Sequence, residues 1–215
     1  MVDLLIPDTS VWLDVVRARA IAQGKAPAPT TTPEDALRVS GLVAAGKLRV
    51  GLLPLVRVEF TRNIDVVLKD THQNYLELAN RLARLRLPEL SPKALKIGQL
   101  ITNDKLLVDQ LMAQADNLPD DQEDLQRAEE RYARRRPPAH AGGSSTHDSR
   151  VLEGALRVAQ TRSSGATWLV TRNTTEFEQG GKLHPELVGE YDTAGLRHAR
   201  SWRQYLSEKQ LLHEP

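Results

Sequence analysis

The feature that most constrains the fold is a short apolar run that ends in a carboxylate. Leu4-Leu5-Ile6-Pro7 is followed at once by Asp8-Thr9-Ser10, and then by apolar residues at helical spacing between positions 11 and 16. The first run predicts a buried strand, and a small polar residue before the periodic stretch predicts a capped helix. We therefore expect a strand, a sharp turn and a helix, with the Asp8 carboxylate at the carboxyl end of the strand.

The alternation of strand and helix patterns continues along the chain. Residues 48–53 predict a second strand, and residues 166–171, which are β-branched and apolar, predict the clearest strand of the chain. Helices are expected from Pro54 and over about 148–160. Strands that alternate with helices predict a parallel sheet covered on both faces, and ligands of such sheets bind beyond the carboxyl ends of the strands.

The chain contains no linker or composition break that would divide it, so we expect one domain over residues 1–215. Residues 71–136 are expected to form a helical insertion. Two separate helical segments are predicted between 71 and 115, broken at Pro88 and at Ser91-Pro92. Polar loops are expected after residue 173, followed by a short strand and a helix at about 195–212.

Composition narrows the class of protein. The chain is 40% apolar and 27% charged, which is the balance of a globular protein. It has no cysteine, which excludes a disulfide framework and a thiolate zinc site. No apolar run is long enough for a signal sequence or a membrane span, so we expect a cytoplasmic protein that does not bind membranes.

Polar residues converge at the predicted carboxyl edge of the sheet. Asp8 ends the first strand, Thr171 and Asn173 follow the clearest strand, and Asp148 begins a helix after a glycine-rich loop. Glu59 can join them from the helix after the second strand. Clustered carboxylates repel one another unless a cation lies between them, and their hard oxygens favour Mg²⁺ or Mn²⁺. Such a metal site suits phosphodiester hydrolysis, because the ion lowers the pKa of a bound water and neutralises the phosphate oxygens.

Four segments resemble the motifs of PIN-domain nucleases, in the order in which that family carries them. Residues 8–14 (DTSVWLD) resemble the opening motif, and Glu59 within residues 58–60 (VEF) resembles the family's second acid. Residues 147–153 (HDSRVLE) are similar to the third motif, and residues 169–177 (LVTRNTTEF) to the last strand and its loop. The glycine-rich stretch before residue 147 is more similar to the larger bacterial PIN proteins than to the compact toxin subgroup.

The resemblance implies a PIN-like three-layer α/β/α sandwich with a central, mainly parallel sheet and helical insertions. It also implies a metal-dependent endoribonuclease in which Asp8, Glu59 and Asp148 are catalytic and bind Mg²⁺ or Mn²⁺. Many members carry an aspartate where this chain has Asn173, while the toxin subgroup often has asparagine there and an acid in the place of Glu176. Asn173 offers a carbonyl oxygen but no charge, so we expect Asn173 and Glu176 to be weaker metal ligands, or the second metal to be absent.

Two further groups of residues are candidates for substrate contact. Thr9, Ser10 and Thr171 could orient water or phosphate, although small hydroxyl residues at strand ends usually only form turns. Arg134, Arg135 and Arg136 could bind RNA. A solvated helix whose acidic and basic halves oppose each other explains this basic run equally well.

Several candidates also have ordinary structural interpretations. Asp8 and Asp148 are attractive helix caps, but capping alone does not explain why both fall at the predicted edge of the sheet. Glu59 is expected to be buried among apolar neighbours, where a carboxylate without a partner is costly, and this favours a function. His140 and His147 flank the glycine-rich loop and are interpreted as surface residues.

Three side chains away from these motifs also receive structural interpretations. Glu153 does not share a helical face with Asp148, so it is as well explained by an ion pair with Arg150 or Arg157 as by a role in the site. Trp12 and Trp168 lie inside apolar runs and are interpreted as core residues.

The same residues argue against two other classes of protein, phosphatases of the haloacid-dehalogenase type and nucleotide-binding proteins. A haloacid-dehalogenase phosphatase would need a second aspartate where this chain has Ser10, and neither a G-x-G-x-x-G nor a P-loop motif occurs. Within the PIN resemblance, two alternatives remain open: a VapC-type toxin held inactive by an antitoxin protein, and a catalytically inactive scaffold that binds RNA or protein. RNA is implied as the substrate by the resemblance alone, and a homodimer is left open.

Overall fold

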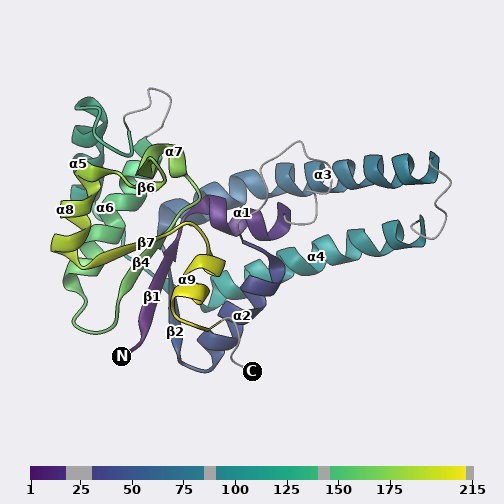
Figure 1. The fold of residues 1–215 in the computed structure, drawn as a ribbon, viewed down its shortest axis with the longest axis horizontal. Coiled ribbons are helices and arrows are strands. Elements are labelled where there is room, and N and C mark those ends of the chain that lie inside the picture. Colours follow the sequence, from purple (N-terminus) through teal and green to yellow (C-terminus); the bar gives the residue numbers. More distant parts are fainter. Residues whose placement is uncertain (18–30, 85–90, 140–145, 212–215) are drawn as a thin grey trace.

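The computed structural model describes residues 1–17, 31–84, 91–139 and 146–211. Within these residues a five-stranded, all-parallel sheet is flanked by helices on both faces, which confirms the predicted α/β/α architecture (Figure 1). The strands in spatial order are β3 (Asp116–Asn117), β2 (Leu48–Leu52), β1 (Asp3–Pro7), β4 (Thr167–Val170) and β7 (Leu196–Ala199). A separate antiparallel pair joins β5 (Glu178–Gln179) to β6 (Lys182–Leu183).

The helices divide into two groups, one for each face. On one face lie α1 (Thr9–Arg17), α2 (Pro33–Ala44), α3 (Pro54–Arg84), α4 (Ser91–Gln114) and α9 (Trp202–Glu208). On the other lie α5 (Gln122–Ala133), α6 (Thr146–Thr161) and α8 (Pro185–Ala194). On one side of β1 the chain adds β2 and then β3. On the other side of β1 it adds β4 and then β7. Right-handed crossovers that run in opposite directions place their helices on opposite faces. The order therefore switches between β1 and β4, and this is where ligands of open α/β sheets bind.

The register of the central strands determines which residues lie side by side at the carboxyl edge of the sheet. Leu5 of β1 pairs with Val50 of β2 on one side and with Trp168 of β4 on the other. Pro7 at the end of β1 pairs with Val170 at the end of β4. The residues that directly follow β1 and β4 are thus neighbours at the same edge of the sheet.

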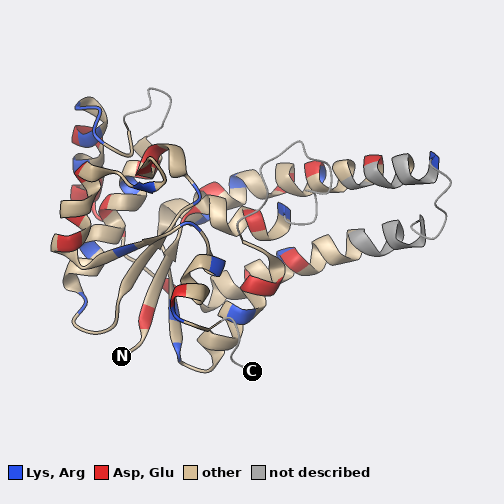
Figure 2. Cartoon of the chain, in the orientation of Figure 1, with Lys and Arg blue, Asp and Glu red and all other residues tan. Residues whose placement is uncertain are grey.

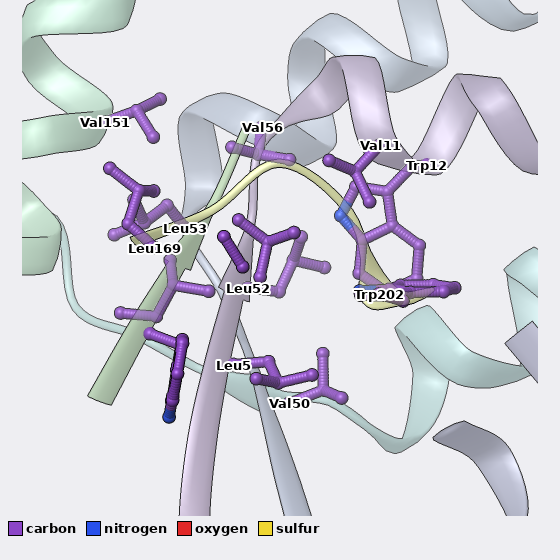
Figure 3. Packing of buried hydrophobic residues seen from close by; sticks show 14 of the residues in the cluster. Leu5, Val11, Trp12, Val50, Leu52, Leu53, Val56, Val151, Leu169 and Trp202 are labelled. Atoms are coloured by element: carbon purple, nitrogen blue, oxygen red, sulfur yellow. The ribbon is translucent and has the colours of Figure 1, made fainter. Parts of the chain in front are cut away.

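The core packs against the sheet from its flanking helices (Figure 3). Trp12 of α1 meets Trp202 of α9 edge to face, with ring centroids 5.2 Å apart, and neither side chain is exposed. Trp168 of β4 makes a similar contact with Tyr205 at 5.3 Å. The predicted core positions of Trp12 and Trp168 are therefore confirmed.

The helical insertion differs from the prediction. The helix that begins at Pro54 does not stop before residue 71 but runs on to Arg84, because α3 contains no glycine and no proline after its first residue. The break falls only between α3 and α4, which lie side by side and project away from the sheet (Figure 1). The first of the two segments predicted between 71 and 115 is therefore the continuation of α3 and not a separate helix, whereas the second is α4.

A ten-residue helix was missed in the sequence. Residues 185–194, expected as polar loop, form α8, although its buried residues are few: Leu187, Tyr191 and Ala194. Its ends carry clear signals, because the His184 side chain caps the first turn, Pro185 follows it, and Gly195 ends the helix with a left-handed φ of 68°. Among the described residues, no helix is both long and apolar enough to cross a bilayer.

Candidate metal centre

Asp8 is fixed at the switch between β1 and β4. Its backbone N–H donates to the carbonyl of Val170 at 2.8 Å, which holds the turn from β1 into α1 against the end of β4. Its carboxylate is 5% exposed and accepts three hydrogen bonds: Oδ1 from the N–H of Thr9 at 2.7 Å, and Oδ2 from Ser10 Oγ at 2.9 Å and Thr171 Oγ1 at 3.2 Å. Ser10 and Thr171 thus orient Asp8, and their contact with substrate, like that of Thr9, stays a prediction.

Burial raises the pKa of Asp8, although the hydrogen bond from Ser10 partly offsets that rise. A buried carboxylate that is costly to ionise and yet rigidly held is suited to a cation, because the cation would remove the cost of the charge. A metal-binding role of Asp8 stays a prediction.

Glu59 reaches the site from α3, but it is not the buried residue that the sequence predicted. Its side chain is 34% exposed and its neighbour Val58 is 57% exposed, so the argument from apolar surroundings was wrong. Position, rather than burial, brings Glu59 to the site: α3 begins directly after β2, whose carboxyl end lies beside that of β1.

The sequence predicts a surface position for His147, whereas the structure places its side chain beside Glu59 and Asp8. Its side chain is only 16% exposed, with Nε2 2.5 Å from Glu59 Oε2 and 4.0 Å from Asp8 Oδ1, so the surface interpretation is overturned. Burial by itself would lower the pKa of His147, but the hydrogen bond and charge of Glu59 outweigh burial and raise it. The same contact lowers the pKa of Glu59. His140 lies outside the described residues.

Asp148 lies in the first turn of α6, and its carboxylate interacts electrostatically with Asp8 and Glu59. Burial raises its pKa to about 7, and the negative charge of Asp8 acts in the same direction. The Asn173 side chain donates from Nδ2 to Asp148 Oδ2 at 2.9 Å. Asn173 was expected to offer a carbonyl oxygen to a metal, whereas here its amide nitrogen holds a carboxylate. Glu176, 7% exposed on α7 (Thr174–Phe177), also raises the pKa of Asp148 through its charge.

The loop that carries Asn173 is tied to α1 by contacts that the sequence did not reveal. Arg172 donates through Nη1 to Asp14 Oδ1 at 2.6 Å, and the Asp14 side chain is fully buried. The N–H of Asn173 donates to Thr171 Oγ1 at 3.1 Å. Asp14 lies within the segment that resembles the opening PIN motif, so its acidic character was visible in the sequence, but its partner was not.

The donor set fits a divalent ion. One ligand atom each from Asp8, Glu59 and His147 can be chosen so that all three lie within 4.8 Å of one another. Carboxylate oxygens are ligands for Mg²⁺ and Mn²⁺, and an imidazole nitrogen is a ligand for first-row transition ions. Burial raises the pKa of Asp8 and of Asp148, so that ionising both carboxylates without a cation is unfavourable, and a bound cation would offset that cost.

Two of the three predicted RNA-binding arginines, Arg134 and Arg136, pair with acidic side chains. Arg136 lies 2.5 Å from Glu190 and 3.8 Å from Glu186, both on α8. Arg134 lies 3.7 Å from Glu130 and is 68% exposed, and Arg135 adopts a left-handed φ of 52° at the end of α5. In Figure 2 the charged residues of α5 are of both signs, whereas those of α8 are all acidic. A role of Arg134, Arg135 or Arg136 in RNA contact remains a prediction.

Glu153 belongs to a buried ion-pair network rather than to the metal site. Arg131, 6% exposed, lies 2.5 Å from Glu153 and 2.6 Å from Glu190, and it also donates to the carbonyl of Pro137 at 2.8 Å. The expected partners Arg150 and Arg157 instead pair with acids of the segment before and within α5. The network joins α5, α6 and α8.

Comparison of the chain with protein-family models, with curated proteins and with solved structures gives no match.

Proposed function

We propose that this protein is a metal-dependent endoribonuclease of the PIN type, which hydrolyses phosphodiester bonds with Mg²⁺ or Mn²⁺ held by Asp8, Glu59 and Asp148. The observation that carries the proposal is the position of Asp8 at the switch between β1 and β4, within 4.8 Å of a ligand atom of Glu59. Burial, together with the charges of Asp8 and Glu59, raises the pKa of Asp148 to about 7. The resemblance of four ordered segments to PIN motifs supplies the choice of RNA.

The residues of the site have different parts in this proposal. Asp8, held by three donors, is a rigid ligand whose orientation is set before the ion binds. Glu59 is the most exposed of the three acids and can follow the ion or the phosphate. When bound, the ion would activate a water molecule and stabilise the charge on the phosphate and the leaving oxygen.

Asp148 contributes a carboxylate whose protonation depends on whether a cation is bound nearby. With a pKa of about 7 it is partly protonated at neutral pH in the absence of a cation, and a bound divalent ion would stabilise its ionised form. Asn173 holds Oδ2 of this carboxylate. Metal binding would therefore release a proton, and it should weaken as the pH falls below about 7.

The proposal is tested by incubating a labelled single-stranded RNA with the purified protein, with Asp8→Asn and with Asp65→Asn. Asp65 is an exposed acid on α3, so its variant controls for the loss of one charge. We expect cleavage by the wild type and by Asp65→Asn, and none by a folded Asp8→Asn. Equal cleavage by Asp8→Asn and the wild type would contradict the proposal. A folded wild type that binds neither ion and cuts no RNA would favour the inactive scaffold.

A further inference from the structure

The imidazole of His147 lies where a ligand of the proposed ion would lie. His147 is the second residue of α6, and its side chain is largely covered. Its Nε2 approaches both Glu59 Oε2, at 2.5 Å, and Asp8 Oδ1, at 4.0 Å. One nitrogen therefore faces two carboxylates that come from different elements of the fold.

The spacing of these atoms suits a shared ion. Ligand atoms about 2.0–2.2 Å from one ion lie about 3 Å apart at adjacent positions and at most about 4.4 Å apart at opposite ones. The atoms of Asp8, Glu59 and His147 lie within 4.8 Å of one another, so small side-chain movements would bring all three to one ion. In the structure, His147 Nε2 already lies 2.5 Å from Glu59 Oε2 and 4.0 Å from Asp8 Oδ1.

We infer that His147 is a direct metal ligand together with Asp8 and Glu59, and that the site is therefore selective for a first-row transition ion such as Mn²⁺ over Mg²⁺. This inference rests on the proposed metal site. Mg²⁺ favours a shell of oxygen ligands in near-ideal octahedral geometry and keeps several waters. A neutral imidazole is a ligand for first-row transition ions. Carboxylate oxygens, by contrast, are ligands for both Mg²⁺ and Mn²⁺.

A positioning role for His147 is the competing explanation, because its contact with Glu59 could serve only to hold that carboxylate. Pulsed electron paramagnetic resonance of bound Mn²⁺ separates the two, since a coordinated imidazole gives a ¹⁴N modulation and a histidine that only holds Glu59 does not. The experiment uses full-length protein with Mn²⁺ alone, as wild type, His147→Gln and His72→Gln. His72 is an exposed histidine on α3, the helix that also carries Glu59.

We expect ¹⁴N modulation in the wild type and in His72→Gln, and its loss in His147→Gln. Calorimetry should show that the ratio of Mn²⁺ to Mg²⁺ affinity falls at least about tenfold in His147→Gln, which corresponds to about 1.4 kcal/mol. A wild type that binds Mn²⁺ without ¹⁴N modulation and still cuts RNA would overturn this inference and leave the nuclease proposal standing. A wild type that binds neither ion would overturn both.

Discussion

Thr171 donates a hydrogen bond through Oγ1 to Oδ2 of Asp8 at 3.2 Å, across 163 positions of the chain. Thr171 is 1% exposed, and its own N–H donates to the carbonyl of Ala199 on β7 at 3.0 Å. The hydroxyl is thus held by β4 and β7 while it holds the residue that follows β1. Asp8 is oriented from both sides of the point where the strand order switches.

Replacement of Thr171 by valine tests this relationship. Thr171→Val keeps the shape of the side chain but removes the donor, and a hydrogen bond to a charged group contributes about 1.5–3 kcal/mol. We expect the affinity for Mn²⁺ to fall about tenfold, measured by calorimetry. Thr171→Ser keeps the hydroxyl and should bind within a few-fold of wild type. Wild-type affinity in Thr171→Val would show that the contact does not prepare Asp8 for a metal.

Asp148→Asn should stabilise the metal-free protein at high pH. Because the folded state raises the pKa of Asp148 from 3.8 to about 7, it binds this proton more tightly than the unfolded state does. Between about pH 4 and 7 the wild type therefore loses stability as the pH rises. The raised pKa of His147 acts in the same direction, since its contribution is present at low pH and is lost as the pH rises through its folded pKa.

The measurement is thermal unfolding in chelator at pH 5 and pH 8. At pH 8 we expect the melting temperature of Asp148→Asn to exceed that of the wild type by at least about 2 °C, which corresponds to about 1 kcal/mol for a chain of this size. The difference should shrink at pH 5. The exposed Asp65→Asn is the control and should show no such trend. A variant that is less stable than the wild type at pH 8 would contradict the direction of the shift.

Asn173→Asp should lower the stability of the metal-free protein and raise its affinity for Mn²⁺. The substitution removes the Nδ2 donor to Asp148 Oδ2 and places a second carboxylate there. Repulsion should lower the melting temperature in chelator, whereas the added charge should tighten Mn²⁺ binding about tenfold, or about 1.4 kcal/mol. Asn173→Ser removes the donor without adding charge. Equal metal affinity in the two variants would show that Asn173 does not limit the charge available to the ion.

The buried ion pairs of Arg131 should contribute more to the free energy of unfolding than an exposed ion pair does. Arg131→Met leaves Glu153 and Glu190 without their shared partner, and breaking a buried ion pair on one side costs about 3–5 kcal/mol. Arg134→Ala removes only an exposed pair with Glu130, for which we expect a change below about 1 kcal/mol. Urea unfolding measures both. Similar losses in the two variants would refute the distinction between the buried and the exposed pair.

The parts of the site that could be predicted are those set by the ends of strands. A parallel sheet brings the residues after β1 and β4 to one edge, so Asp8 and Thr171 could be placed together from the apolar runs that precede them. The position of Glu59 followed from the helix after β2. The exposure of the Glu59 side chain could not be predicted, because which side of α3 is buried depends on how α3 packs against α1 and α6.

The parts that could not be predicted depend on how helices sit against one another. His147 follows a glycine-rich segment with no periodic pattern, and its contact with Glu59 exists only because the start of α6 lies near the start of α3. The pairing of Arg131 with Glu190 on α8 could not be foreseen, because the sequence of residues 185–194 predicts a polar loop. Buried polar partners far apart in sequence leave no local signal in a single chain.

The most direct test of the central claim is cleavage of a labelled single-stranded RNA with Mn²⁺, with excess chelator, and with Mn²⁺ restored after the chelator. The account predicts that the wild type cuts only when the ion is present and recovers on its return, and that folded Asp148→Asn does not cut under any of the three conditions. Cleavage that persists in chelator, or in Asp148→Asn at the wild-type rate, would contradict it.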